Sequence, residues 1–191
     1  MSKIDYFDTL VKISELSERS VVLASDSGCE KNASATSAKL RDECDSLVFE
    51  LEKSLFEDFL PPLERNSIAA CAHSLSRVIE KANDLSLYQE SAKAPLGYKN
   101  EECIVCIKLA AELKKHTTIL KTIRKPSETP DIAGFRKILD EGRAANKSFI
   151  KKMRHGTLPP SAMRISILTS RLRFELSRAF DDIIEIMLNN I

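Results

Sequence analysis

The chain has 191 residues and a mass of 21.4 kDa, and 43% of its residues are hydrophobic and 30% charged. Five glycines and seven prolines are too few for a β-sandwich, a β-barrel or a glycine-rich phosphate-binding fold, and the apolar content is too high for a disordered chain. The 29 basic and 28 acidic residues leave a net charge of +1, which predicts no strong attraction to nucleic acid or to an anionic membrane. These values favour an all-α domain.

Apolar residues recur at three- and four-residue steps in six segments, which is the spacing of a buried helical face. The first two helices are expected at about 3–26 and about 30–58. Ser2 and Asp5 form a capping box for the first helix, and Gly28 marks its end. The buried face of the second helix is expected to comprise Ala33, Ser37, Leu40, Cys44, Leu47, Leu51 and Leu55.

The third helix is expected at about 64–89, and the fourth begins after Asn100 as its N-cap and ends before Pro126. The buried face of the third is expected to comprise Ile68, Cys71, Leu75, Val78, Ala82 and Leu85. That of the fourth is expected to comprise Cys106, Leu109, Leu113 and Leu120.

Thr129-Pro130-Asp131 predicts the start of the fifth helix, with Thr129 as N-cap, and Gly156 predicts its end. Its buried face is expected to comprise Ile132, Phe135, Leu139, Gly142, Ala145, Phe149 and Met153. The sixth helix, at about 161–189, is expected to bury Ile165, Leu168, Leu172, Leu176, Ala179, Ile183 and Met187. Six long helices joined by short loops favour a six-helix antiparallel bundle.

A weak internal repeat divides the chain into halves. Leu60-Pro61-Pro62 recurs 98 residues later as Leu158-Pro159-Pro160, and each copy lies between two long helices. The same offset pairs Val78 with Leu176, Ala82 with Phe180, Asp84 with Asp182 and Leu85 with Ile183. We therefore expect one domain, 1–191, made of two three-helix units at about 1–94 and 95–191. The alternative is that prolines collected twice between helices by chance.

The junction between the second and third helices carries a family resemblance. Phe59, Pro62, Arg65 and Ile68 follow a Phe-x-x-Pro-x-x-Arg-x-x-Ile spacing, preceded by the acidic run 42–45. With the residues that fit the helices on either side, this pattern resembles the PhoU-like family of phosphate transport regulators across nearly the whole chain. The further residues that fit the family pattern are Leu75, Val78, Ile79, Glu80, Asp84, Asp181, Asp182, Ile183 and Ile184.

The resemblance implies an oxygen-rich metal site, because the family places acids four residues apart on facing helices. The acids that survive at matching places are Asp45, Glu80, Asp84, Asp181 and Asp182. Other matching places carry residues that do not ligate metal in this setting: Arg41, Ser76, Leu139, Arg143, Phe174 and Arg178.

We therefore expect any metal role to be lost or reduced to one weak site. Glu80 and Asp84 are then a solvated acidic face, paired with Lys81 or with arginines of the bundle. The alternative is that the surviving acids converge on a divalent or iron metal.

The cysteines and histidines offer weaker candidates. Cys103-Ile104-Val105-Cys106 is a CxxC, but no second Cys or His pair completes a zinc site, and two packing thiols are expected. Five cysteines without a secretory signal favour a cytoplasmic protein with reduced thiols. The basic run 151–155 suits a helix C-terminus, with anion binding as the alternative.

By resemblance, the expected function is that of a non-enzymatic regulator of inorganic phosphate transport. Its partner is expected to be a phosphate permease of the Pit type, contacted at the cytoplasmic face of the inner membrane by a chain without a membrane span. A homo-oligomer is left open. Two alternatives remain: a metal-binding helical bundle that keeps a reduced acidic site, and a helical scaffold unrelated to phosphate.

Overall fold

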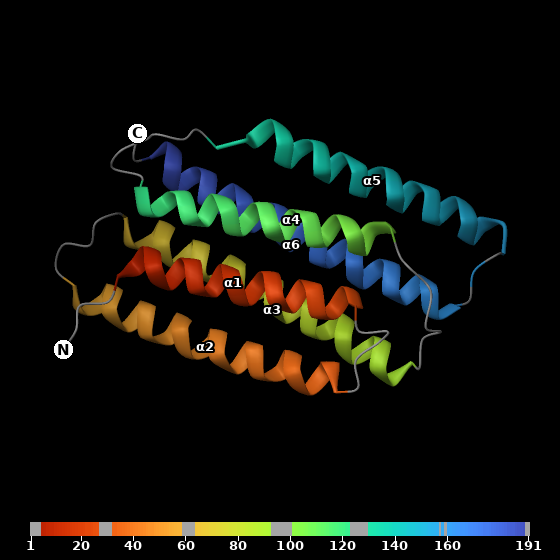
Figure 1. The fold of residues 1–191 in the computed structure, drawn as a ribbon, viewed down its shortest axis with the longest axis horizontal. Helices are drawn as coiled ribbons and strands as arrows, with labels where there is room; N and C mark the ends of the chain where they lie inside the picture. The colour runs from red at the N-terminus through yellow and green to blue at the C-terminus, as the bar shows by residue number, and fades with distance from the viewer. Residues whose placement is uncertain are drawn as a thin grey trace.

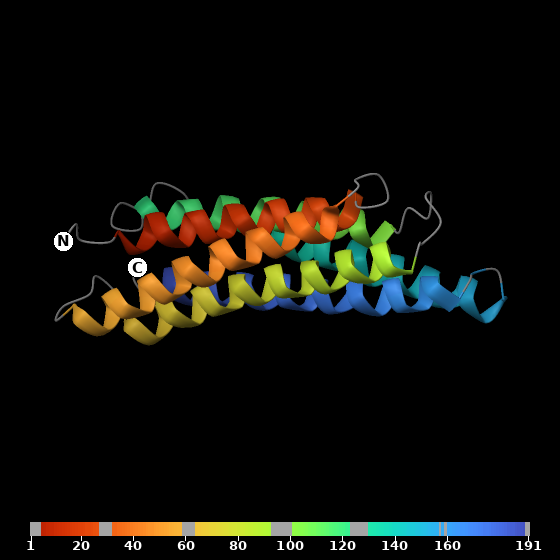
Figure 2. The same ribbon diagram turned by 90° about the horizontal axis from the view of Figure 1, so that it is seen from below.

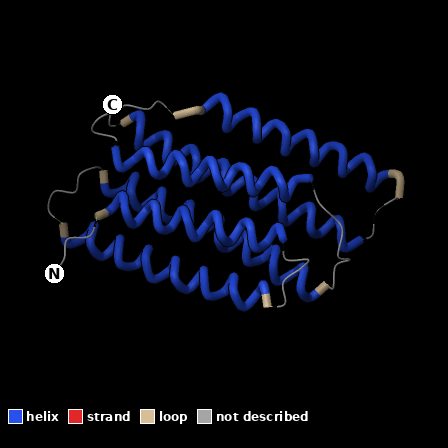
Figure 3. The backbone as a smooth tube through the Cα atoms, in the orientation of Figure 1, coloured by secondary structure: helices blue, strands red, loops and turns tan. Residues whose placement is uncertain are grey.

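The computed structural model describes residues 5–26, 32–58, 64–92, 101–122, 130–156, 158 and 160–189. Within these ranges the chain is helical and contains no strand (Figure 3), which confirms the all-α prediction. The elements are α1 (Tyr6–Asp26), α2 (Ala33–Glu57), α3 (Arg65–Ser91), α4 (Glu101–Ile119), the short 3₁₀ helix η1 (Leu120–Thr122), α5 (Ile132–Arg154) and α6 (Pro160–Leu188). Successive α-helices run in opposite directions along one long axis (Figure 1).

Four helices form the centre of the bundle. Helix α1 packs on α3 and α4, and α6 packs on the same two helices. Helix α2 lies against α1 and α3 at one edge, while α5 lies against α4 at the opposite edge (Figures 1 and 2). The contact between α5 and α6 is much less extensive than the contact between α2 and α3, so a seam between α5 and α6 stays partly open.

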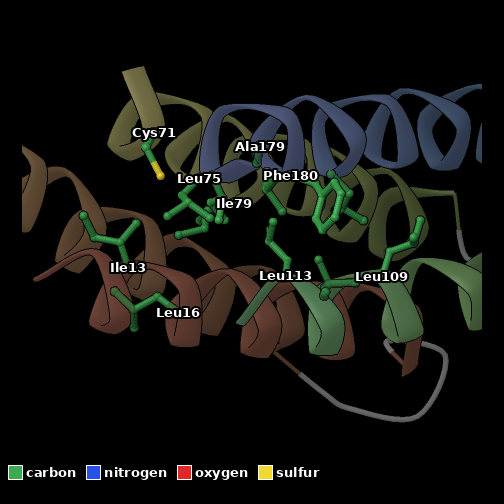
Figure 4. Packing of buried hydrophobic residues seen from close by; sticks show 14 of the residues in the cluster. Ile13, Leu16, Cys71, Leu75, Ile79, Leu109, Leu113, Ala179 and Phe180 are labelled. Atoms are coloured by element: carbon green, nitrogen blue, oxygen red, sulfur yellow. The ribbon is translucent and has the colours of Figure 1, made fainter. Parts of the chain in front are cut away.

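One continuous apolar core joins all six helices. Ile13 of α1, Leu75 of α3, Leu113 of α4 and Phe180 of α6 all belong to this core and lie in the space between the four helices (Figure 4). Every residue predicted for the buried faces of α3, α4 and α6 is buried. In α2, Val48 is buried where Leu47 was expected, and Leu47 is only partly buried. Burial of each large aliphatic side chain contributes about 1.5–3 kcal/mol, so this core is the main source of stability.

The helix starts differ in detail from the predictions. The Asp5 carboxylate accepts hydrogen bonds from the backbone N–H groups of Phe7 (3.0 Å) and Asp8 (3.1 Å) and so caps α1 itself, while Ser2 lies outside the described residues. The prediction of Thr129 as the cap of α5 is wrong, because the Asp131 carboxylate accepts from the N–H of Gly134 at 2.8 Å. A charged acceptor one residue before the helix serves its N-terminal N–H groups directly.

Glycines have specific roles at both ends of α5. A Cβ at Gly134 would lie 2.2 Å from Oδ2 of Asp131, so a larger residue there would displace the capping carboxylate from its present position. Gly156 adopts φ +67° just past the end of the helix, as predicted for a terminating glycine. Gly28 and Asn100, the other predicted end signals, lie outside the described residues.

His116, buried near the end of α4, fixes the start of α5. Its Nδ1 lies 2.7 Å from the carbonyl oxygen of Glu112, and its Nε2 accepts the backbone N–H of Asp131 at 3.1 Å. These two partners assign a neutral ring with the proton on Nδ1. The ring meets Phe180 edge-on at 5.0 Å, and Phe180 stacks on Phe135 at 3.7 Å between ring centres. This cluster therefore holds one end of α5 against α4 and α6.

Candidate functional site

Four of the five acids singled out by the resemblance contact other groups of the protein. Asp45 on α2 is exposed and lies 3.8 Å from the guanidinium of Arg41. On α3, the Lys81 ammonium lies 2.7 Å from Glu80 and 3.4 Å from Asp84. The hydrogen bond to Glu80 raises the pKa of Lys81, so its positive charge is held between the two carboxylates. Glu80 and Asp84 thus share a lysine, as expected for an acidic face neutralised by the chain itself.

The two acids on α6 lie at a different level of the bundle. Asp182 accepts a hydrogen bond from the Ser74 hydroxyl of α3, and Asp181 is exposed beside it. Ser74 precedes Glu80 by six residues, which is about 9 Å along a helix. The structure therefore brings Glu80 and Asp84 together, and Asp181 and Asp182 together, but sets the two pairs apart.

Partial burial and the neighbouring Asp182 raise the pKa of Asp181, and Arg136 of α5 opposes that rise. Among the described residues, no group of three or more His, Cys, Asp or Glu side chains is placed to hold a metal ion.

A chain of polar contacts joins α3 to α6 between these levels. Arg77 donates to the Ser74 hydroxyl at 2.6 Å and lies 3.3 Å from Glu175 of α6. Ser74 in turn donates to Asp182. Ser74, Arg77, Glu175 and Asp182 are thus joined across the α3–α6 contact by hydrogen bonds and one ion pair.

The CxxC cysteines are buried thiols. Cys103 Sγ lies 3.7 Å from the Thr169 hydroxyl, and Cys106 Sγ lies 3.8 Å from the Thr169 carbonyl oxygen of α6. Burial raises the pKa of the Cys103 thiol to about 11 and that of Cys106 well above its usual value. Both thiols therefore stay protonated and pack against α6, as expected.

An open apolar trough lies between the second half of α5 and the first half of α6. It encloses a cavity of about 750 Å³. We call this surface the α5/α6 trough, and its apolar lining is Phe149, Ile150, Met153, Met163, Ile167 and Phe174. Met163 and Phe174 are each more than half exposed. Apolar side chains gathered in a concave surface make the trough a candidate binding site, unlike the scattered apolar exposure of an ordinary surface.

The charged residues that line the trough are mostly basic. Arg154 and Arg171 line it, as do Lys81 and Glu175, whose partners are described above. Lys151, Lys152 and Arg154 form the last turn of α5. With two flexible methionines and arginine anchors beside apolar rings, the surface has the composition of a protein contact site.

A buried ion pair lies under the trough. Glu102 of α4 has a side chain only 1% exposed, and its Oε1 accepts from Arg173 Nε and from the Ser170 hydroxyl, both at 2.9 Å. Asn146 of α5 donates to that hydroxyl at 2.5 Å. This network joins α4, α5 and α6 and fixes how far α5 stands from α6.

Gly142 allows Arg173 to reach this place. A Cβ at Gly142 would lie 2.6 Å from Arg173 Cδ and 3.0 Å from Val105 Cγ1. Beyond this crossing, a smaller cavity of about 390 Å³ separates the other halves of α5 and α6, next to the Asp140–Arg143 ion pair at 2.7 Å. The seam is therefore open on both sides of the arginine.

Sequence reasoning assigned none of the apolar residues of the trough to a contact site. One signal was available in α6, where Met163, Ile167 and Phe174 form an apolar row beside the buried one. The basic run 151–155 was another, although it was interpreted as a helix end.

Comparison of the sequence with known protein families and with curated proteins finds no match. In the part of the chain that the structure describes, no helix combines the length and the apolar character needed to cross a bilayer.

Proposed function

We propose that the protein is a non-enzymatic regulator of inorganic phosphate transport that acts by contact with a phosphate permease of the Pit type. The observation that carries the proposal is the α5/α6 trough, an exposed apolar surface with arginine anchors and a defined cavity. The phosphate link comes from the resemblance of the 59–68 junction and its flanking helices to PhoU-like regulators.

The fold proposed is a PhoU-like pair of three-helix units. The contact pattern supports it in part, because α2 lies beside α1 and α3, and α5 lies beside α4 and, less closely, α6. The central contacts, α1 with α4 and α3 with α6, join the corresponding first and third helices of the two units. The offset of 98 residues also relates Arg77 to Glu175, which form an ion pair.

Several residues favour contact over metal chemistry. Phe174 stands where the resemblance would place an acid, and it lines the trough instead. Arg41 stands at another such place and lies beside Asp45. Lys81 supplies a charge between Glu80 and Asp84 that a bound cation would otherwise supply. The proposed site of action is the cytoplasmic face of the inner membrane, reached through the permease.

Phosphate uptake in a deletion strain tests this proposal. We expect uptake to change on deletion, to be restored by the wild-type gene, and not to be restored by the double variant Met163→Ser/Phe174→Ser. Leu87→Ser, which also removes an exposed apolar side chain but from α3, is the matched control and should restore uptake. Unchanged uptake in the deletion strain would contradict the phosphate link.

The metal alternative is tested separately by elemental analysis of the purified protein. The proposal expects no stoichiometric metal. Stoichiometric iron or zinc that is lost in Asp84→Asn, but kept in the exposed control Asp140→Asn, would favour a metal-binding bundle instead.

A further inference from the structure

The opposite edge of the bundle carries a surface that complements the trough. Phe49 and Phe56 of α2 are 67% and 89% exposed, the highest values among the large apolar residues described. They are seven residues apart, so they project from one side of the helix. Asp42, Asp45 and Glu52 lie on the same side. We call these five residues the α2 ridge.

The dimensions of ridge and trough agree. Seven residues place the two rings about 10 Å apart along α2. On α6, the trough lining runs from Met163 to Phe174, eleven residues or about 16 Å of helix. Both rings can therefore enter one trough, and on their own chain both are largely exposed, although Glu52 of the ridge lies 2.8 Å from His73 of α3.

The two edges also carry opposite charge. Helix α2 has six acidic and three basic residues, whereas α5 has seven basic and two acidic. The near-neutral chain is thus strongly polarised between its two outermost helices. Arg154 and Arg171 at the trough would face the acids of the ridge, a match that favours association and orients it.

We propose that the α2 ridge of one copy docks in the α5/α6 trough of a second copy. Phe49 and Phe56 enter the apolar lining, and the ridge carboxylates lie beside the arginines. Because α2 and α5 are at opposite edges (Figure 1), the contact joins different edges of the two copies. Each added copy then leaves one ridge and one trough unused, and assembly continues until a ring closes.

The shape of the surface favours a protein partner over a lipid surface. Binding in a bilayer interface requires apolar side chains that project from a convex face. Here the apolar side chains line a cavity between two helices, and a protruding helical ridge fits such a surface. Self-association through ridge and trough does not depend on a permease. A permease segment that binds in the same trough would compete with it.

Sedimentation velocity of the full chain over a concentration series tests the proposal. We expect concentration-dependent association that weakens as salt is raised, because the charge contribution is screened. A ridge variant, Phe49→Ser/Phe56→Ser, and a trough variant, Met163→Ser/Phe174→Ser, should each raise the dissociation constant at least about tenfold. Leu87→Ser should leave association unchanged, and circular dichroism should show all variants folded.

Mixing the two variants gives the decisive result. The ridge variant keeps its trough and the trough variant keeps its ridge, so the mixture should form a one-to-one complex that grows no further. A mixture that stays monomeric, or a wild-type chain that stays monomeric at every concentration, would overturn the proposal. So would association that survives in both variants.

Discussion

The buried ion pair between Glu102 and Arg173 offers the sharpest test of how α5 and α6 are held. The variant Arg173→Met keeps an apolar stem of similar length and takes away the cation that lies 2.9 Å from Glu102 Oε1. Removing one partner of a buried pair costs about 3–5 kcal/mol because a buried charge loses its compensation. Since the arginine side chain is 16% exposed, we expect a somewhat smaller loss, about 2–4 kcal/mol.

The Arg143–Asp140 pair is a matched control on α5. Its N–O distance is 2.7 Å, shorter than in the buried pair, but the side chains are 65% and 68% exposed. Arg143→Met should therefore cost only about 0–1 kcal/mol. The free energy of unfolding of both variants is measured by urea denaturation followed by circular dichroism. If Arg173→Met lowers the free energy of unfolding no more than Arg143→Met does, burial does not make the Glu102–Arg173 pair the more important one for stability.

One further measurement separates charge from packing. Glu102→Gln in the Arg173→Met background removes the buried charge, so the double variant should be more stable than Arg173→Met alone. A double variant no more stable than Arg173→Met would indicate a packing defect.

Three other predictions concern neighbouring features. Gly142→Ala should lower the free energy of unfolding, measured by urea denaturation, although alanine favours helices over glycine by about 1 kcal/mol. The same substitution should cost less in an Arg173→Ala background, where the side chain that would clash is gone. An increase in stability on Gly142→Ala alone would contradict the close approach of Arg173 to Gly142. Asp131→Ala should cost about 1 kcal/mol by the same assay, and an unchanged midpoint would show that the cap is dispensable. In a Cys29→Ser background, a thiol reagent at pH 8 should react slowly with the native protein and fully after unfolding, because burial raises the pKa of Cys103 to about 11 and that of Cys106 well above its usual value. Rapid labelling of either thiol in the native protein would indicate that the CxxC is a reactive site.

The helices and their buried faces could be predicted because the three- and four-residue spacing of apolar residues is a local property of the sequence. The faces of α3, α4 and α6 are buried as expected. The burial of Glu102 could not be predicted from the spacing of apolar residues. Its place in the first turn of α4 follows from the predicted N-cap at Asn100, but its burial against Arg173 depends on how α4 is rotated towards α6. That rotation is set by the packing of α4 against the other helices and cannot be derived from the sequence of one segment alone.

In the candidate site, too, features within one helix could be predicted, whereas contacts between helices could not. The spacing of Glu80 and Asp84 correctly predicts that they share a helix face. Whether Asp182 joins them depends on the register of α3 against α6, which places it opposite Ser74 instead. The trough escaped prediction because it arises where α5 separates from α6, so that Phe149 and Met153, expected in the core, also line an open surface.

Binding of the purified chain to a Pit-type phosphate permease tests the central claim most directly. The permease from the source cell, reconstituted in nanodiscs, is titrated with wild-type protein, with Met163→Ser/Phe174→Ser and with Leu87→Ser. Contact through the α5/α6 trough predicts saturable binding of the wild type and of Leu87→Ser, and a dissociation constant at least about tenfold higher for the trough variant. Equal binding of all three proteins, or binding of none, would contradict it.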